Sequence, residues 1–171
     1  MEKSNIDEKI KLLTGSGMWH TQEVEGLPSV HLSDGPHGLR KQEEKERQNN
    51  VSLVSTCYPT ASALACSWDV TAAERLGRAV AKEAWNADVA VLLGPGINMK
   101  RSPLCGRNFE YFSEDPFLAG RLGAAYVSAA QGEDVASISR PTIRRPTGRR
   151  PTARSTNAPC GRFTSAPLNT W

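Results

Sequence analysis

The sequence contains few of the residues that build metal centres or disulfide frameworks. It has four cysteines, at positions 57, 66, 105 and 160, and three histidines. The cysteines form no C-x-x-C pair, and the histidines show no H-x-x-x-H spacing. These absences argue against a zinc site and a disulfide framework, and no cofactor is expected. Phosphate-binding G-x-G-x-x-G and Walker patterns are also missing.

Long hydrophobic runs are missing as well. The first residues, MEKSNIDEKIKLL, interleave charges with apolar side chains. This pattern predicts neither a signal peptide nor a membrane span, so no membrane partner is expected and the cytoplasm is the expected location.

Acidic residues are absent from one part of the chain only. The net charge is +3, but residues 1–139 carry 14 basic and 18 acidic side chains, whereas residues 140–171 carry seven arginines and no acid. The basic excess therefore belongs to the tail. The length of 171 residues allows one core but falls short of the roughly 250 residues of a complete (β/α)₈ barrel.

Strand and helix patterns alternate along the first four-fifths of the chain. A short helix is expected near the start, with Ile6, Ile10 and Leu13 on one face. Residues 27–32 alternate apolar and polar side chains and predict a strand that delivers Asp34 to its carboxyl end. A charge run over residues 41–50 predicts an exposed loop.

Two longer helices have clear start signals. Asp69 can cap a helix with a core-facing stripe of Val70, Ala73, Leu76, Val80 and Ala84. Asp115 followed by Pro116 predicts a second helix, whose apolar face is Leu118, Leu122, Ala125, Tyr126 and Ala129. Strands are expected at residues 89–93 and 135–138. This order is the βαβ pattern of a parallel sheet or barrel, an α/β fold.

The stretch 89–116 joins a strand to a polar loop. Its aliphatic run ends at Gly94-Pro95-Gly96, which predicts a buried parallel strand followed by a turn. The loop beyond it carries the charged residues Lys100, Arg101, Arg107, Glu110, Glu114 and Asp115. Loops at the carboxyl ends of parallel strands commonly bind ligands, so a site is expected here.

Three motifs carry a resemblance to a known family. The segments GPGINMKRSP (94–103), GRNFEYFSEDP (106–116) and LPSVHLSDGPHGLR (27–40) strongly resemble the N-terminal domain of glycoside hydrolase family 3, the β-glucosidase group. The resemblance covers roughly four-fifths of the chain. It implies the N-terminal portion of a (β/α)₈ TIM-like barrel and, in the intact protein, hydrolysis of terminal β-linked glucosyl residues by a retaining mechanism. A small oligosaccharide or β-glucoside is the implied substrate.

The resemblance also implies roles for individual residues. Asp34 matches an aspartate that holds hydroxyls of the terminal glucosyl unit, and Arg107 matches a sugar-binding arginine. On composition alone Asp34 is a turn-stabilising residue before Gly35, and Arg107 forms an ion pair with Glu110 or Glu114; for the arginine both roles can hold together. Lys100 and Arg101 are further candidates for the pocket lining.

The catalytic carboxylates of the family are expected outside this chain. The family takes its aspartate nucleophile from farther along the barrel and its glutamate acid/base from a following domain. Its Lys-His pair after the strand at 135–138 is replaced here by Ser139-Arg140. Glu110, Glu114 and Asp115 are not assigned as an acid and base pair, since Asp115 is expected to cap a helix. The chain is therefore expected to be inactive alone.

The pattern changes abruptly after residue 138. The segment from residue 139 repeats Arg-Pro-Thr three times and has no apolar periodicity. The division expected is therefore a partial family 3 domain at 1–138 and a basic, irregular or disordered Arg/Pro-rich tail at 139–171. A shifted reading frame is one hypothesis for the tail. If suitable codons are chosen for these residues and read one base earlier, they encode Lys-Ala-Asn-Asn-Gln-Glu followed by an amphipathic helix, as in the family.

Three functions follow, in order of preference. The first is a truncated or frameshifted β-glucosidase-like hydrolase. The second is a non-catalytic carbohydrate-binding remnant. The third is a nucleic-acid-binding protein that uses the Arg-rich tail, although no nucleic acid partner is expected. The oligomeric state is left open.

Overall fold

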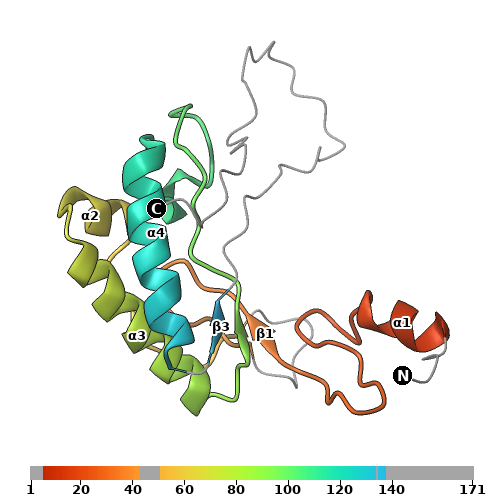
Figure 1. Cartoon of the computed structure of the whole chain (residues 1–171). Coiled ribbons are helices and arrows are strands. Elements are labelled where there is room, and N and C mark those ends of the chain that lie inside the picture. The colour runs from red at the N-terminus through yellow and green to blue at the C-terminus, as the bar shows by residue number, and fades with distance from the viewer. Residues whose placement is uncertain (1–5, 43–50, 134, 138–171) are drawn as a thin grey trace, which may run out of the picture.

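The computed structural model describes residues 6–42, 51–133 and 135–137. These residues form a small parallel sheet with helices packed on one side of it (Figure 1). The elements in chain order are α1 (Ile6–Leu12), β1 (Leu32–Ser33), α2 (Ala61–Cys66), α3 (Val70–Asn86), β2 (Val91–Leu92), the 3-10 turn η1 (Asn108–Glu110), α4 (Pro116–Gln131) and β3 (Ala136–Ser137). The tail and the segment 43–50 lie outside the described residues.

The three strands are parallel and lie in the order β1-β2-β3. Leu32 pairs with Val91, and Val91 pairs with Ala136. Parallel neighbours require a crossover, which α2 and α3 supply between β1 and β2, and which α4 supplies between β2 and β3. The predicted α/β class and βαβ order are confirmed.

The first strand is shorter than predicted. Only Leu32 and Ser33 join the sheet, because the residues before them pair with a preceding segment instead. Thr21 donates its backbone N–H to Val30 at 3.1 Å, and Leu32 donates to Trp19 at 2.7 Å. Residues 27–30 therefore face a local antiparallel segment, whereas the His31 carbonyl already accepts the N–H groups of Ala90 and Val91. The strand predicted at 27–32 was wrong in its start. Its end before Asp34 was right.

The two long helices start where predicted. The Asp69 carboxylate accepts the N–H of Thr71 at 2.8 Å. Asp115 accepts the N–H groups of Phe117 and Leu118 at 3.1 and 3.0 Å, with Pro116 as the first helical residue. Each cap satisfies donors that have no partner within the helix.

The core lies between these helices and the strands. Val80, Ala81 and Ala84 of α3 pack with Tyr126 and Ala130 of α4, with Leu92 of β2, and with Val89 and Val135 just before β2 and β3. A second cluster joins α2 to the other end of α4; its buried members are Ala61, Ala65, Ala73, Phe112, Ala119, Leu122 and Ala125. The predicted core-facing stripes thus meet one another.

The first helix forms but does not join the core. No residue of α1 is buried, and Ile6, Ile10 and Leu13 are 71, 54 and 87% exposed. Figure 1 shows α1 well away from α3 and α4. The short helix was predicted correctly, and its three apolar residues are not covered by the rest of the described chain.

Two absences hold for the described residues. No helix there is both long enough and apolar enough to span a bilayer. No cluster of three or more histidine, cysteine, aspartate or glutamate side chains is placed to hold a metal ion within the same ranges. Cys57 and Cys66 are free and exposed, whereas Cys105 is disulfide-bonded, which the cysteine spacing did not predict.

Candidate functional site

Asp34 stands at the carboxyl end of β1 and begins a tightly closed loop. Arg40 donates its backbone N–H to the Asp34 carbonyl at 2.8 Å, so the loop returns to its starting point. Gly35 has φ +147°, and a Cβ there would lie 1.7 Å from the Gly38 carbonyl oxygen. Only glycine can occupy that position, and the loop it permits turns the chain sharply beside Asp34.

The Asp34 carboxyl is set between opposing charges. Burial raises its pKa above the usual value, and the negative charge of Glu110 acts in the same direction. The positive charges of Arg40 and Arg107 lower the pKa but do not cancel the effect of burial. Two arginines and one glutamate therefore surround this carboxylate.

Arg107 lies in the loop after β2, immediately before η1. Its Nε–H donates to Oε1 of Glu110, three residues on, in an ion pair. The same guanidinium lies over the Tyr111 ring, with Cζ 5.8 Å from the ring centroid. The bond to Glu110 raises the pKa of Arg107, so the guanidinium is charged at every physiological pH.

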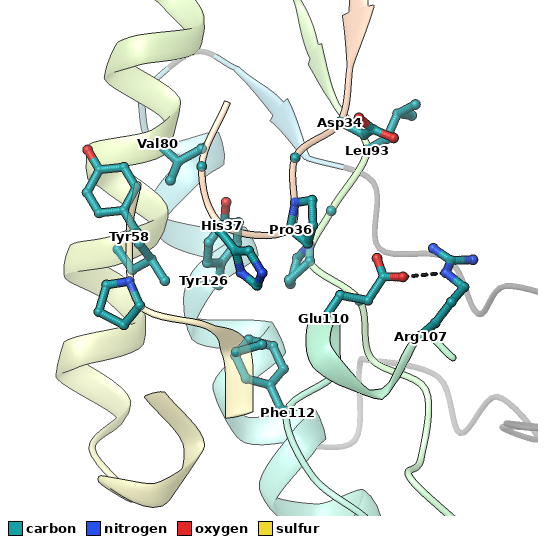
Figure 2. Close-up of a pocket in the computed structure, with 18 residues that line it drawn as sticks. Asp34, Pro36, His37, Tyr58, Val80, Leu93, Arg107, Glu110, Phe112 and Tyr126 are labelled. Carbon is teal, nitrogen blue, oxygen red and sulfur yellow. Dashed lines mark hydrogen bonds and ion pairs between the residues drawn. The ribbon is translucent and has the colours of Figure 1, made fainter. Parts of the chain in front are cut away.

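One cavity joins these groups. It encloses about 420 Å³, within the usual range for small-molecule sites. Its charged lining residues are Asp34, Arg107 and Glu110, and Figure 2 shows the last two facing each other across their ion pair. Its apolar and aromatic lining includes Tyr58, Leu76, Val80, Leu93, Phe112 and Tyr126. The cavity therefore has a charged side and an apolar side.

The other two predicted site residues stand apart from this cavity. Lys100 donates from Nζ to the Ser62 hydroxyl, and its partial burial lowers its pKa. Arg101 is exposed and contacts the Met99 sulfur at 3.8 Å. Neither residue lines the cavity, so the structure brings Asp34 and Arg107 together without Lys100 and Arg101.

The three carboxylates of the loop have separate roles, of which the sequence predicted the cap by Asp115 and left the partner of Arg107 open. Glu110, not Glu114, is the partner of Arg107, and Glu114 is exposed. Asp115 caps α4. None of the three forms a pair of carboxylates facing each other across the cavity: Glu110 alone among them lines it.

Sequence reasoning missed the aromatic and histidine part of the lining. His37 lines the cavity, and its buried Nδ1 has no hydrogen-bond partner among the described residues. Tyr58 donates its hydroxyl to Glu83 at 2.9 Å, which turns its ring toward α3. Tyr126 is 8% exposed, and burial raises the pKa of its hydroxyl above the usual value, so it stays neutral. No local motif marks these residues, because they meet only after folding.

A parallel α/β sheet with a partly charged cavity beyond the carboxyl ends of β1 and β2 defines a small-molecule site of the kind that α/β enzymes use. Comparison with known proteins names the family. The family model for the glycosyl hydrolase family 3 N terminal domain matches residues 35–140. The chain belongs to glycoside hydrolase family 3.

Individual relatives support the same assignment. The chain is 48% identical over 141 residues to thermostable beta-glucosidase B of Acetivibrio thermocellus, covering 80% of this chain and 19% of that protein. It is 44% identical over 137 residues to an exo-alpha-(1->6)-L-arabinopyranosidase of Bifidobacterium longum, covering 77% of this chain and 18% of that protein.

Solved structures of the family share the fold. The GH3 beta-glucosidase of Bifidobacterium adolescentis superposes with a TM-score of 0.72 at 42% identity, covering 80% of this chain and 19% of that chain. Beta-glucosidase 3B of Thermotoga neapolitana, in complex with glucose, gives a TM-score of 0.73 at 33% identity over 83% of this chain and 22% of that chain. The chain thus spans about a fifth of the length of these relatives.

Proposed function

We propose that this chain is the sugar-binding part of a β-glucosidase-like hydrolase that cleaves terminal β-linked glucosyl residues by a retaining mechanism. The observation that carries the proposal is the placement of Asp34 and Arg107 on one cavity beyond the carboxyl ends of β1 and β2. Relatives at 48 and 42% identity are named beta-glucosidases. A β-glucoside or small oligosaccharide is the proposed substrate.

The chemistry of the two residues fits a sugar. A carboxylate accepts hydrogen bonds from hydroxyls, a guanidinium donates them, and both bonds are charge-assisted. The cavity of about 420 Å³ has room for a sugar ring. Its apolar side offers a surface for the C–H face of the ring, while Asp34 and Arg107 contact the hydroxyls. Lys100 and Arg101 remain candidates for contacts farther from the ring.

The three strands are proposed as the first strands of a (β/α)₈ barrel. Their spatial order follows the chain order, and each crossover carries a helix to the same side of the sheet. A barrel is built by repeating that unit until the last strand pairs with the first. In such a barrel Asp34 and the loop after β2 would lie on the same rim.

Binding without turnover is proposed for the chain by itself. Retaining glycosidases need two carboxyl groups about 5–5.5 Å apart on either side of the scissile bond. Among the described carboxylates near the cavity, Glu110 is held in an ion pair with Arg107. Asp34 is the one left to contact a hydroxyl, so the acid and the nucleophile are proposed to come from the rest of the family's length.

The experiment that tests the proposal is a sugar titration of the full 171-residue chain, followed by NMR. Glucose is expected to shift resonances of the Asp34 loop and of η1, and Asp34→Asn is expected to weaken binding by tenfold or more, because a charge-assisted bond is lost. L-arabinose is included because one relative is named an arabinopyranosidase. Shifts elsewhere in the chain, or equal binding by Asp34→Asn, would contradict the proposal.

A non-catalytic carbohydrate-binding protein is the second candidate, favoured by the ion-paired state of Glu110. Turnover separates the two. The chain with 4-nitrophenyl β-glucoside is expected to release no nitrophenol, with an intact family 3 β-glucosidase as the positive control. Release by the chain, lost on Asp34→Asn, would show that the catalytic groups are present after all.

A further inference from the structure

Glu110 occupies an unusual place for a glutamate near a solvent-facing loop. Its side chain is 14% exposed, whereas the Arg107 side chain that it pairs with is 48% exposed. It lines the cavity beside Arg107, as Figure 2 shows. The carboxylate is thus the fixed member of the pair, and the guanidinium is the member that reaches solvent.

The hydrogen bond uses one particular edge of the guanidinium. Oε1 of Glu110 accepts from Nε–H of Arg107, and among the described residues no hydrogen bond is made by the two Nη groups. The side chain is therefore held at its Nε, while the donors at its far end remain available in the cavity. A guanidinium has five N–H donors in a rigid plane, so fixing one edge fixes the direction of the others.

The Tyr111 ring supports the guanidinium from below. Its centroid lies 5.8 Å from the Arg107 Cζ, within the range of a cation–π contact. Tyr111 is 2% exposed and pairs with Gly96 in a β-bridge just beyond β2. A Cβ on Gly96 would lie 2.8 Å from Tyr111 Cδ1, so the missing side chain lets the ring approach. The position of the Tyr111 ring is thereby fixed relative to the chain that follows β2.

We propose that Glu110 is a positioning residue for sugar binding: it orients Arg107 over Tyr111 so that the Nη groups point to the hydroxyls of the bound sugar. This inference rests on the proposed function. An arginine side chain otherwise loses rotamer entropy when a ligand orders it. Glu110 and Tyr111 order the side chain before the ligand arrives, so that cost does not fall on binding.

The first test needs no sugar. In the full chain, Arg107 Nε–Hε is expected to give a sharp NMR resonance with slow exchange with water, because Glu110 accepts that proton. Glu110→Gln is expected to speed the exchange about tenfold or more, and the matched control Glu114→Gln, at an exposed carboxylate, is expected to leave it unchanged. Fast exchange in the unchanged chain would overturn the inference even where the proposed function holds.

The second test separates positioning from a merely structural role through a double-variant cycle. Glu110→Gln is expected to weaken glucose binding about tenfold in the unchanged chain, since it removes a charge-assisted bond. In an Arg107→Lys background, which lacks the Nε–H, Glu110→Gln is expected to weaken glucose binding less than twofold. An equal loss in both backgrounds would overturn the inference. Absence of glucose binding by the unchanged chain would instead contradict the proposed function, and the exchange test would still judge Glu110.

Discussion

Gly77 of α3 lies against the backbone of Tyr126 in α4, so closely that a Cβ on Gly77 would stand 2.3 Å from the Tyr126 carbonyl oxygen. The two helices therefore cross at a point where one of them has no side chain. Val80, one turn along α3 from Gly77, and Tyr126 itself both line the cavity. The glycine thus sets the distance between the helices that form the cavity's apolar side.

Gly77→Ala is expected to lower the free energy of unfolding by roughly 1–3 kcal/mol, because the new methyl group forces the helices apart. Gly120→Ala in α4 is the matched control, since a Cβ there meets nothing within 4 Å. That change is expected to stabilise the chain by about 0.5–1 kcal/mol through the better helix propensity of alanine. Urea unfolding followed by circular dichroism measures both. Equal effects of the two substitutions would contradict the close crossing.

The Asp115 cap gives a second stability prediction. Asp115→Ala removes the acceptor for two backbone N–H groups, those of Phe117 and Leu118. The free energy of unfolding is expected to fall by about 1 kcal/mol, with a range of about 0.5–2. Glu114→Ala, one residue earlier, is exposed and serves as the control. Urea unfolding again provides the measurement, and a cap that contributes nothing would make the two variants alike.

The parts of the fold predicted correctly were those with local signals. Asp69 and Asp115 are adjacent in sequence to the N–H groups that they cap, and the apolar stripes of α3 and α4 repeat within each helix. The start of β1 depended instead on whether residues 27–30 pair with the sheet or with the preceding segment 19–24. That competition is between two distant partners for the same backbone groups, and no pattern within the strand decides it.

The candidate site, like the fold, could be predicted only in part from the sequence. Asp34 and Arg107 were predicted from family motifs, and the structure places both on one cavity. The sequence left the ion-pair partner of Arg107 open between Glu110 and Glu114, and the structure selects Glu110. Lys100 belongs to the same loop, yet its bond to Ser62 of α2 draws it away from the cavity. Its place depends on how α2 packs beside the loop, which the loop sequence does not contain. The cavity's aromatic lining depends on the same packing.

The raised pKa of Asp34 predicts opposite effects of Asp34→Asn on stability and binding. In the folded chain, burial favours the protonated carboxyl. Ionisation of Asp34 therefore opposes folding. The stability that its protonated carboxyl contributes is fully present below the ordinary pKa of an aspartate, and it is lost as pH rises through the raised pKa. Asp34→Asn is expected to stabilise the chain at pH 7 and to have little effect at pH 3, while sugar binding falls at least tenfold.

Thermal unfolding at both pH values, with a glucose titration at pH 7, measures this pair of effects. Asp88→Asn is a suitable control, because that aspartate lies outside the cavity. A lower melting temperature for Asp34→Asn than for the unchanged chain at pH 7 would mean that the carboxylate is stabilised by its arginines, contrary to the direction inferred here.

The charges around Asp34 predict how its titration responds to Arg40. After burial, Arg40 has the largest effect on the Asp34 pKa, and it lowers it. Arg40→Gln is therefore expected to raise the pKa further, which moves the acid limb of sugar binding to higher pH, since the carboxylate is the binding form. Carbon-detected NMR of the Asp34 carboxyl measures the pKa directly. Arg78→Gln, whose ion-pair partner is Glu133 just after α4, is the charge-matched control.

The last prediction concerns the codons for residues 139–171. The match to the family model covers residues 35–140, and from residue 139 the composition changes to repeated Arg-Pro-Thr without acids. We expect the nucleotide sequence, read one base earlier across these codons, to encode an asparagine-rich turn and an amphipathic helix of the family kind. Sequencing the gene and its transcript through this region measures it. Stop codons in that frame, or a peptide without helical periodicity, would contradict the frameshift hypothesis. The Arg-rich tail would then be a genuine part of the protein and would need a separate explanation.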